Sequence, residues 1–103
     1  MIPGFSYELF TTRNIGFVTE AEQARLRQAT IFVCGVGGMG GAAFMALVRA
    51  GIGRFVIADI DVFEISNLNR QVFAHAGTIG RPKAEAAAEA ARAINPEIEI
   101  EVL

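Results

Sequence analysis

The chain has 103 residues, a hydrophobic fraction of 52% and a formal net charge of −2 at pH 7. This length suits one domain, and this hydrophobic content excludes a disordered chain. The acidic balance argues against non-specific nucleic-acid binding, and the single cysteine excludes an internal disulfide and favours a reducing compartment.

The sequence contains no pattern typical of membrane insertion or secretion. The N-terminal residues lack the basic start and apolar core of a signal peptide. The longest apolar stretch, residues 35–48, contains five glycines and is too short to span a bilayer. We therefore expect a soluble, cytoplasmic protein without a membrane partner.

The first third of the chain is expected to lead through a helix into a buried strand. Residues 19–29 predict a helix, because Thr19 and Glu22 have the spacing of a capping box. Residues 29–34 are apolar, largely β-branched and run directly into glycines, which predicts a strand buried on both faces of a parallel sheet. Cys34 ends this strand, where we expect a buried and inert thiol.

The middle of the chain repeats this alternation. Glycine-rich residues 35–41 are followed by a helical pattern that ends near Gly51 and Gly53. Residues 54–61 predict a second buried strand. The stretch that follows is expected to be a loop with one helical turn near Asn67.

The last third contains the clearest helix. Residues 81–95 are rich in alanine, glutamate, lysine and arginine, and Pro82 suits the first turn. Residues 97–103 alternate between polar and apolar side chains, which predicts a strand with one wet face, or an edge strand.

This order of elements is that of the first half of a doubly wound α/β sheet. We therefore predict an α/β fold with a Rossmann-like parallel sheet and flanking helices. Residues 1–103 would form a single Rossmann-like domain, with residues 1–28 as an N-terminal helical extension. Two complete halves need about 150 residues or more, so we expect the N-terminal half of a longer fold.

Glycines between the first strand and the following helix predict a nucleotide loop. Gly35, Gly37 and Gly40 form the pattern G-x-G-x-x-G, with Gly38 inside it. The first permits a tight turn, the second lets a phosphate approach, and the third allows close packing of helix on strand. Asp59 ends the second strand, 19 residues beyond the last of these glycines, where an acid suits ribose hydroxyls. The alternative is a structural turn beside an aspartate that caps the next loop.

Polar and cationic side chains follow this acid at Asn67, Arg70 and Lys83. A guanidinium can grip phosphate oxygens bidentately and an ammonium acts as a mobile charge, so the set suits a polyphosphate whose bonds are broken. The alternative is that Asn67 caps a turn while the two cations are solvated. The glycines and Asp59 alone would also suit a nicotinamide-dependent oxidoreductase.

Four segments resemble, in order and spacing, the ThiF/MoeB-type adenylyltransferases of the ubiquitin-activating-enzyme-like superfamily: GVGGMGG, ADIDVFEISNLNRQVF, IGRPKAEAAAEAA and INPEIEI. The resemblance covers about residues 13–103. It implies that magnesium-ATP is used to adenylate the C-terminal glycine carboxylate of a small ubiquitin-like or sulfur-carrier protein, with release of pyrophosphate.

By matching positions, the resemblance also implies roles for single residues. The glycines of residues 35–40 form the nucleotide loop, and Asp59 holds the ribose. Asn67, Arg70 and Lys83 contact the phosphates, and the two cations stabilise the charge that develops during transfer.

The family resemblance also includes two further residues, Arg13 and Asp61. Arg13 lies where family members carry an arginine that reaches the ATP phosphates of the partner subunit. Together with the large apolar residues before Thr19, this predicts that the N-terminal stretch packs against a second copy in a symmetric homodimer. Asp61, the second acid of the DxD pair, belongs to the nucleotide-binding motif without an assigned role.

The chain also departs from the family pattern. The family's magnesium-binding aspartate lies beyond residue 103, as do its catalytic cysteine and structural zinc ligands, so we expect no metal site here and a chain that is incomplete for catalysis on its own. Some heterodimeric members keep the fold and lose the site, so a non-catalytic partner subunit is a further alternative. The presence of Asn67, Arg70 and Lys83 argues against it.

Overall fold

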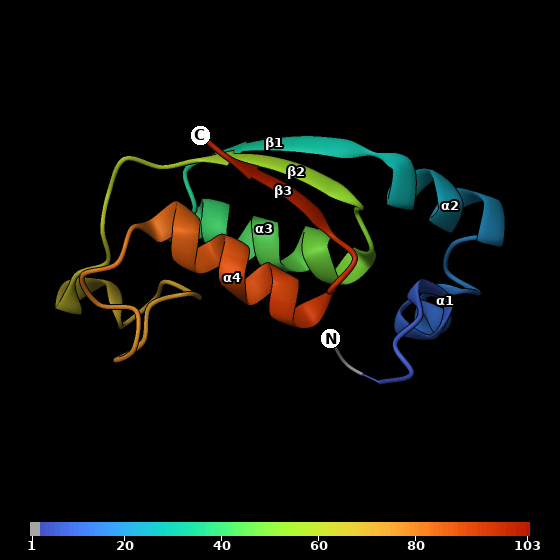
Figure 1. Cartoon of the computed structure of the whole chain (residues 1–103), viewed down its shortest axis with the longest axis horizontal. Helices are drawn as coiled ribbons and strands as arrows, with labels where there is room; N and C mark the ends of the chain where they lie inside the picture. The colour runs from blue at the N-terminus through green and yellow to red at the C-terminus, as the bar shows by residue number, and fades with distance from the viewer. Residues whose placement is uncertain (1–2) are drawn as a thin grey trace.

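A parallel sheet of three strands forms one layer of the molecule, and helices lie against one of its faces (Figure 1). The structure is a computed structural model that describes residues 3–103. The strands lie in chain order, with the second in the middle: β1 Thr30–Cys34, β2 Arg54–Ala58 and β3 Glu99–Val102. The predicted α/β fold with a parallel sheet is confirmed.

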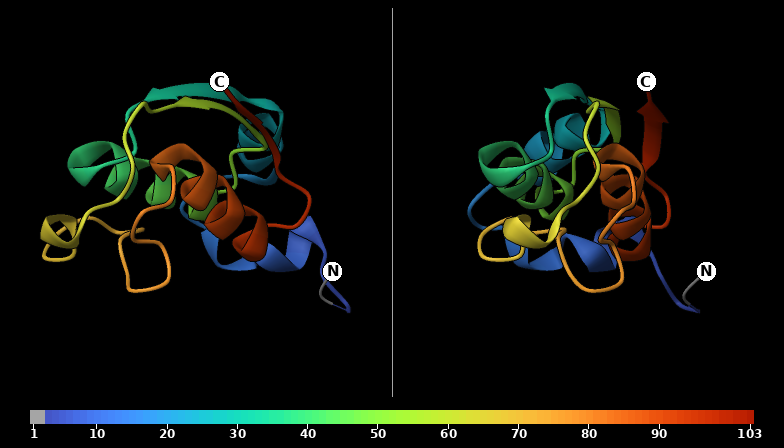
Figure 2. Two further views of the ribbon diagram at one scale, coloured as in Figure 1. Left: turned by 60° about the vertical axis from the view of Figure 1, so that its left-hand side comes forward. Right: turned by 90° about the vertical axis from the view of Figure 1, so that its left-hand side faces the viewer.

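Each connection between neighbouring strands contains a helix. α3 (Gly38–Ala50) joins β1 to β2, and α4 (Lys83–Ile94) precedes β3. Both helices lie on the same side of the sheet in the views of Figures 1 and 2. Between β2 and α4 runs a long loop with one 3₁₀ turn, η2 (Ile65–Asn67), where the sequence predicts a helical turn.

The core lies between the sheet and these two helices. Phe44 of α3 packs edge-on against Phe55 of β2, with ring centroids 4.7 Å apart and both side chains fully buried. α4 buries alanines against this cluster, and small side chains allow the helix to approach closely. The core therefore fixes both helices relative to the ends of the strands.

The outer face of β1 is open in the described residues. Phe32 is 58% exposed and Cys34 is exposed, whereas Ile31 and Val33 on the opposite face are half-buried. The prediction of a strand buried on both faces is therefore wrong, as is that of a buried Cys34 thiol. The reason is that α3 and α4 share one face, and no helix within residues 3–103 buries the other face of this strand.

β2 ends three residues earlier than predicted, at Ala58 instead of residue 61. The carboxylate of Asp59 accepts a hydrogen bond from the backbone N–H of Asp61, which turns the chain away from the sheet.

None of the helices in residues 3–103 is long and apolar enough to cross a bilayer.

The N-terminal part of the chain is helical and precedes β1. It contains α1 (Tyr7–Phe10), η1 (Thr12–Asn14) and α2 (Glu20–Gln28). The predicted capping box of α2 is present: Thr19 Oγ1 accepts from the N–H of Glu22 at 3.1 Å, and Glu22 Oε1 accepts from the N–H of Thr19 at 2.8 Å.

Tyr7 anchors this part on the C-terminal end of α3. Its buried hydroxyl donates to the carbonyl oxygen of Gly51 at 2.6 Å and accepts from Gln23 Nε2 at 2.8 Å. Part of the stretch predicted to pack on a second copy thus packs within its own chain. Other large apolar side chains of this stretch remain exposed: Leu9, Ile15 and Phe17.

Candidate functional site

The glycine loop joins the end of β1 to the start of α3. Gly35 has a φ of 93°, a left-handed conformation that glycine adopts readily. A Cβ on Gly40 would lie 1.9 Å from the carbonyl oxygen of Gly35, and one on Gly41 would lie 2.8 Å from that of Val36. The loop can therefore pack this closely on the first turn of α3 only because these positions carry no side chain.

The N-terminus of α3 offers unused backbone donors. Gly37 is the N-cap and has no side chain to cap the helix. The first bond of the helix runs from the N–H of Gly41 to the carbonyl of Gly37 at 3.0 Å, which leaves the N–H groups before it without a partner in the helix. These groups and the positive end of the helix dipole favour an anion.

Asp59 ties this loop to the turn after β2. Its Oδ2 accepts from the N–H of Val36 at 2.9 Å, and its Oδ1 accepts from the N–H of Asp61 at 2.8 Å. A carboxylate has further lone pairs, so it can still accept from ribose hydroxyls. Asp61 is exposed, and its backbone carbonyl accepts from the N–H of Lys83 at 2.9 Å, which connects the start of α4 to the same turn.

Lys83 is a largely buried residue, with 8% of its surface exposed. Its Nζ lies 5.6 Å from the ring centroid of Phe63, and no carboxylate of residues 3–103 lies within ion-pair distance of it. Nearby Arg81, by contrast, pairs with Glu89 at 2.7 Å, and its hydrogen bond and positive charge lower the pKa of the Glu89 carboxyl. The ammonium of Lys83 is therefore available to an anionic ligand.

Asn67 and Arg70 lie in the loop between β2 and α4. Asn67 is buried, and its Oδ1 accepts from the N–H of Glu64 at 2.8 Å, so its oxygen caps η2. Its amide nitrogen is the group that could reach a ligand. Arg70 is exposed, and its Nη1 donates to Ser66 O at 3.2 Å and to Asn69 Oδ1 at 2.9 Å, which leaves its other N–H groups for a ligand.

Gln71 was missed by the sequence interpretation. Its side chain is buried, and its amide lies beside Gly37, since a Cβ there would be 3.5 Å from both Gln71 Nε2 and Oε1. Its Oε1 is buried and has no hydrogen-bond partner in the described residues. Gln71 is the last residue of the motif SNLNRQ, but its position beside the glycine loop depends on the path of the long loop after β2.

Arg13 lies at the other end of the molecule. Its neighbour Asn14 donates from Nδ2 to Ala50 O at 3.3 Å, at the C-terminal end of α3, whereas the glycine loop lies at the N-terminal end. The 13 residues of α3 separate these ends by about 20 Å. Figure 1 shows the N-terminal helices at one end of the sheet and the start of α3 at the other. Arg13 therefore does not meet the other candidates within one chain.

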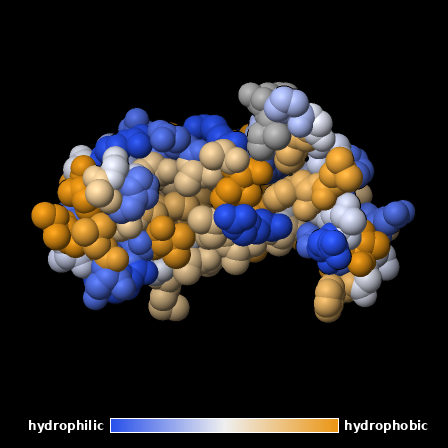
Figure 3. Space-filling view, turned by 90° about the horizontal axis from the view of Figure 1, so that it is seen from below, coloured by the Kyte–Doolittle hydropathy of each residue, from blue (hydrophilic) through white to orange (hydrophobic). Residues whose placement is uncertain are grey.

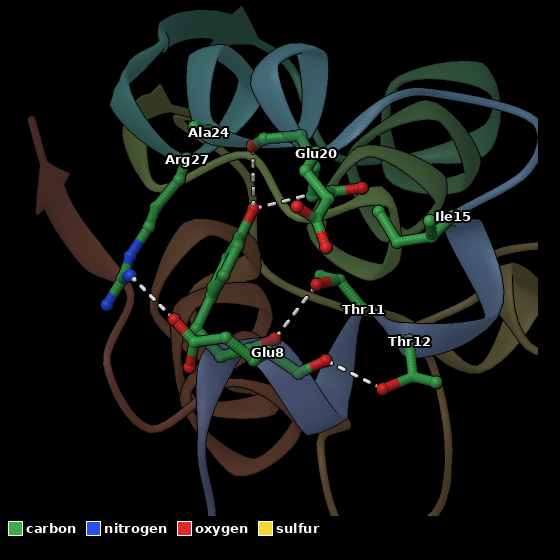
Figure 4. A pocket seen from close by; sticks show the side chains of 9 residues that line it. Glu8, Thr11, Thr12, Ile15, Glu20, Ala24 and Arg27 are labelled. Atoms are coloured by element: carbon green, nitrogen blue, oxygen red, sulfur yellow. Dashed lines mark hydrogen bonds and ion pairs between the residues drawn. The ribbon is translucent and has the colours of Figure 1, made fainter.

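A cavity of about 700 Å³ opens beside the N-terminal helices (Figure 4). Its wall comes from α1, η1 and α2, and Arg27 reaches across it to Glu8, with Nη1 and Oε1 3.5 Å apart. None of the predicted nucleotide ligands lines it. We place the candidate site at the glycine loop instead, because free N–H groups lie there and the backbone of Lys83 bonds to the turn that Asp59 ties to this loop.

Exposed apolar side chains lie on the segments that carry the candidate site. Figure 3 shows hydrophobic groups at the end of the molecule that is formed by the loop after β2. The most exposed of them near this loop are Met39, Ile60 and Ile65. An apolar surface beside an anion site suits a ligand or partner that has both an apolar part and an anionic part.

Comparisons with known proteins agree with this architecture. The model of the ThiF family matches residues 11–103. The tRNA threonylcarbamoyladenosine dehydratase of Haemophilus influenzae is 45% identical over 80 residues, which are 78% of this chain and 31% of that protein. The molybdopterin-synthase adenylyltransferase of Salmonella typhimurium is 42% identical over 85 residues, 82% of this chain and 34% of that protein. The chain thus spans about a third of the length of these relatives.

A solved structure shares the fold over the whole chain. The E. coli tRNA N6-threonylcarbamoyladenosine dehydratase TcdA, in complex with ATP, superposes with a TM-score of 0.93 and 33% sequence identity. The match covers 100% of this chain and 42% of that one. Because the family model matches nearly every residue and the fold agrees, the chain belongs to the ThiF family.

Proposed function

We propose that this chain is the ATP-binding part of an enzyme that adenylates the C-terminal glycine carboxylate of a ubiquitin-like or sulfur-carrier protein. The observation that carries this proposal is Lys83, a largely buried residue whose ammonium has no acidic partner in the described residues and whose backbone is joined through Asp61 and Asp59 to the glycine loop. A cation whose stem is held by packing and whose ammonium has no acidic partner is positioned to bind an anion.

In this proposal each candidate residue has a chemical task. The N–H groups of residues 37–40 hold phosphate oxygens, and Asp59 accepts from the ribose hydroxyls. The amide nitrogen of Asn67 and the guanidinium of Arg70 hold the triphosphate. The C-terminal carboxylate of the carrier protein attacks the α-phosphorus of ATP, and the bond from that phosphorus to pyrophosphate breaks. Arg70 and Lys83 stabilise the charge that develops on the phosphate oxygens.

Magnesium enters this proposal through the family resemblance. Within residues 3–103 no group of three or more His, Cys, Asp or Glu side chains could hold a metal ion. We therefore assign the magnesium ligand to no residue of this chain.

The single free cysteine fits a reducing compartment, and we propose a cytoplasmic location.

A second candidate function is the modification of tRNA. It is favoured by the similarity, over most of the chain, to relatives named tRNA threonylcarbamoyladenosine dehydratase. The two candidates differ in the acceptor. ATP consumption by the purified protein should be stimulated by a carrier protein that ends in glycine under the first proposal, and by tRNA alone under the second.

Nucleotide choice tests the proposal directly. We expect isothermal titration calorimetry to show binding of ATP or AMP in preference to NAD, because the cations suit phosphates at the glycine loop and the family includes a member solved with ATP. The control is the Arg70→Ala variant, which should lose affinity for ATP. Tight binding of NAD without detectable binding of ATP would refute the proposal and favour the oxidoreductase alternative.

We also propose a homodimer in which Arg13 serves the site of the partner, because it lies near the C-terminal end of α3, a helix about 20 Å long with the glycine loop at its other end. Light scattering should report a dimer. A sharper test mixes Arg13→Ala with Lys83→Ala, each inactive alone. In a mixed dimer one site keeps both residues, so random exchange should restore about a quarter of the wild-type activity. No recovery in a verified mixed dimer would show that Arg13 does not act across the interface.

A further inference from the structure

Gln71 carries a hydrogen-bonding group that the described residues do not use. Its backbone is held on both sides, since its N–H donates to Asn67 O at 3.0 Å and its carbonyl accepts from the N–H of Ala74 at 3.0 Å. The residue is 8% exposed, and its Oε1 is buried without a partner in residues 3–103. Buried side-chain amides are almost always hydrogen-bonded, so this one calls for an explanation.

The amide lies directly beside the anion-binding end of α3. A Cβ on the N-cap, Gly37, would lie 3.5 Å from both Nε2 and Oε1 of Gln71. Two independent features therefore meet at this point: the free N–H groups of the helix and a buried amide without a partner. The helix N–H groups and the Nε2 of this amide can all donate to one ligand that accepts hydrogen bonds.

We infer that Gln71 binds the phosphate seated at the N-terminus of α3, and donates a hydrogen bond from Nε2 to a phosphate oxygen; this inference rests on the proposed ATP site. Nε2 has no hydrogen-bond partner in residues 3–103 and is not enclosed as Oε1 is, so it can donate to a ligand beside Gly37 without a turn of the amide. Phosphate oxygens only accept, which makes the amide nitrogen the matching group. Gln71 is thus a neutral phosphate ligand next to the cations Arg70 and Lys83.

Methionine and glutamate variants separate this role from simple packing. Gln71→Met keeps the length of the side chain and removes its hydrogen-bonding atoms. We expect the unfolding temperature without ligand to stay the same or rise, because an unsatisfied buried amide is lost. The Kd for ATP should rise about tenfold or more, the worth of a hydrogen bond to a charged group. Gln71→Glu should bind ATP more weakly still, because its carboxylate repels phosphate.

Gln28→Met is the matched control, since it makes the same chemical change at an exposed position at the end of α2 and should leave both measurements unchanged. Adenosine, which lacks phosphate, should bind Gln71→Met as it binds the wild type. Equal ATP affinity of Gln71→Met and wild type would overturn the inference. So would a parallel loss for ATP and adenosine with a lowered unfolding temperature, which would mark Gln71 as a packing residue. A wild type that does not bind ATP would count against the proposed function, and titration of wild type and Gln71→Met with inorganic tripolyphosphate would then decide the role of Gln71.

Discussion

Replacing Gly40 with alanine is expected to destabilise the protein by about 3 kcal/mol or more, and to abolish ATP binding. The added Cβ would lie 1.9 Å from the carbonyl oxygen of Gly35 and 2.8 Å from its carbonyl carbon. Both are backbone atoms, so no side chain can move aside, and the loop and α3 must separate instead. Urea unfolding gives the change in stability, and calorimetry gives the change in ATP affinity.

Gly38→Ala is the matched control for the stability of Gly40→Ala. A Cβ at Gly38 meets no atom within 4 Å, and this residue is the first of α3. Alanine is a better helix former than glycine by about 1 kcal/mol, so this variant should be as stable as the wild type or slightly more stable. If Gly40→Ala unfolded at the same urea concentration as Gly38→Ala, the close packing of loop on helix would not exist in solution.

Replacing Lys83 with alanine is expected to slow ATP–pyrophosphate exchange about 100-fold or more, and to weaken ATP binding by a smaller factor. The physical reason is that a positioned ammonium stabilises the transition state, in which charge develops on the phosphate oxygens, more than it stabilises bound ATP. Arg70→Ala should have the same effect. The assay is exchange of labelled pyrophosphate into ATP by the full-length enzyme with its carrier protein.

Arg81→Ala provides the comparison for Lys83→Ala, because it removes a cation two residues away. Arg81 already pairs with Glu89 at the surface, and exposed pairs of this kind contribute little. Its exchange rate should therefore stay near that of the wild type. An unchanged rate in Lys83→Ala would show that this lysine has a structural role only. Equal losses in both variants would point to a general effect of positive charge.

The sheet and its helices were predictable because their signals are local. The capping box at Thr19 and the alternating residues of β3 each specify an element within a few residues, and both are present. The alternation of strands and helices then predicts a parallel sheet, since the connections between parallel strands contain helices. The pattern of the glycines likewise predicts the turn at Gly35 and the close packing at Gly40.

Features that depend on tertiary arrangement were not predictable in this way. An apolar strand such as β1 has the same sequence whether one face or two are covered, so the exposure of Phe32 and Cys34 could not be inferred. The long loop after β2 decides that Gln71 lies under Gly37, and no short-range rule specifies its path. Similarly, Tyr7 meets Gly51 across 44 residues of chain, through a hydrogen bond that no local pattern indicates.

The contacts of the N-terminal helices with the last turn of α3 join segments that are distant in sequence into one unit of local unfolding. The carbonyl of Ala50 accepts from both Gln23 Nε2 and Asn14 Nδ2, and that of Gly51 accepts from the Tyr7 hydroxyl. Detaching the N-terminal helices would remove these donors, so the backbone amides near the end of α3 should lose protection from hydrogen exchange together with them. A protease cut or an affinity tag near residue 7 would thus loosen the same helix whose first turn carries the glycine loop.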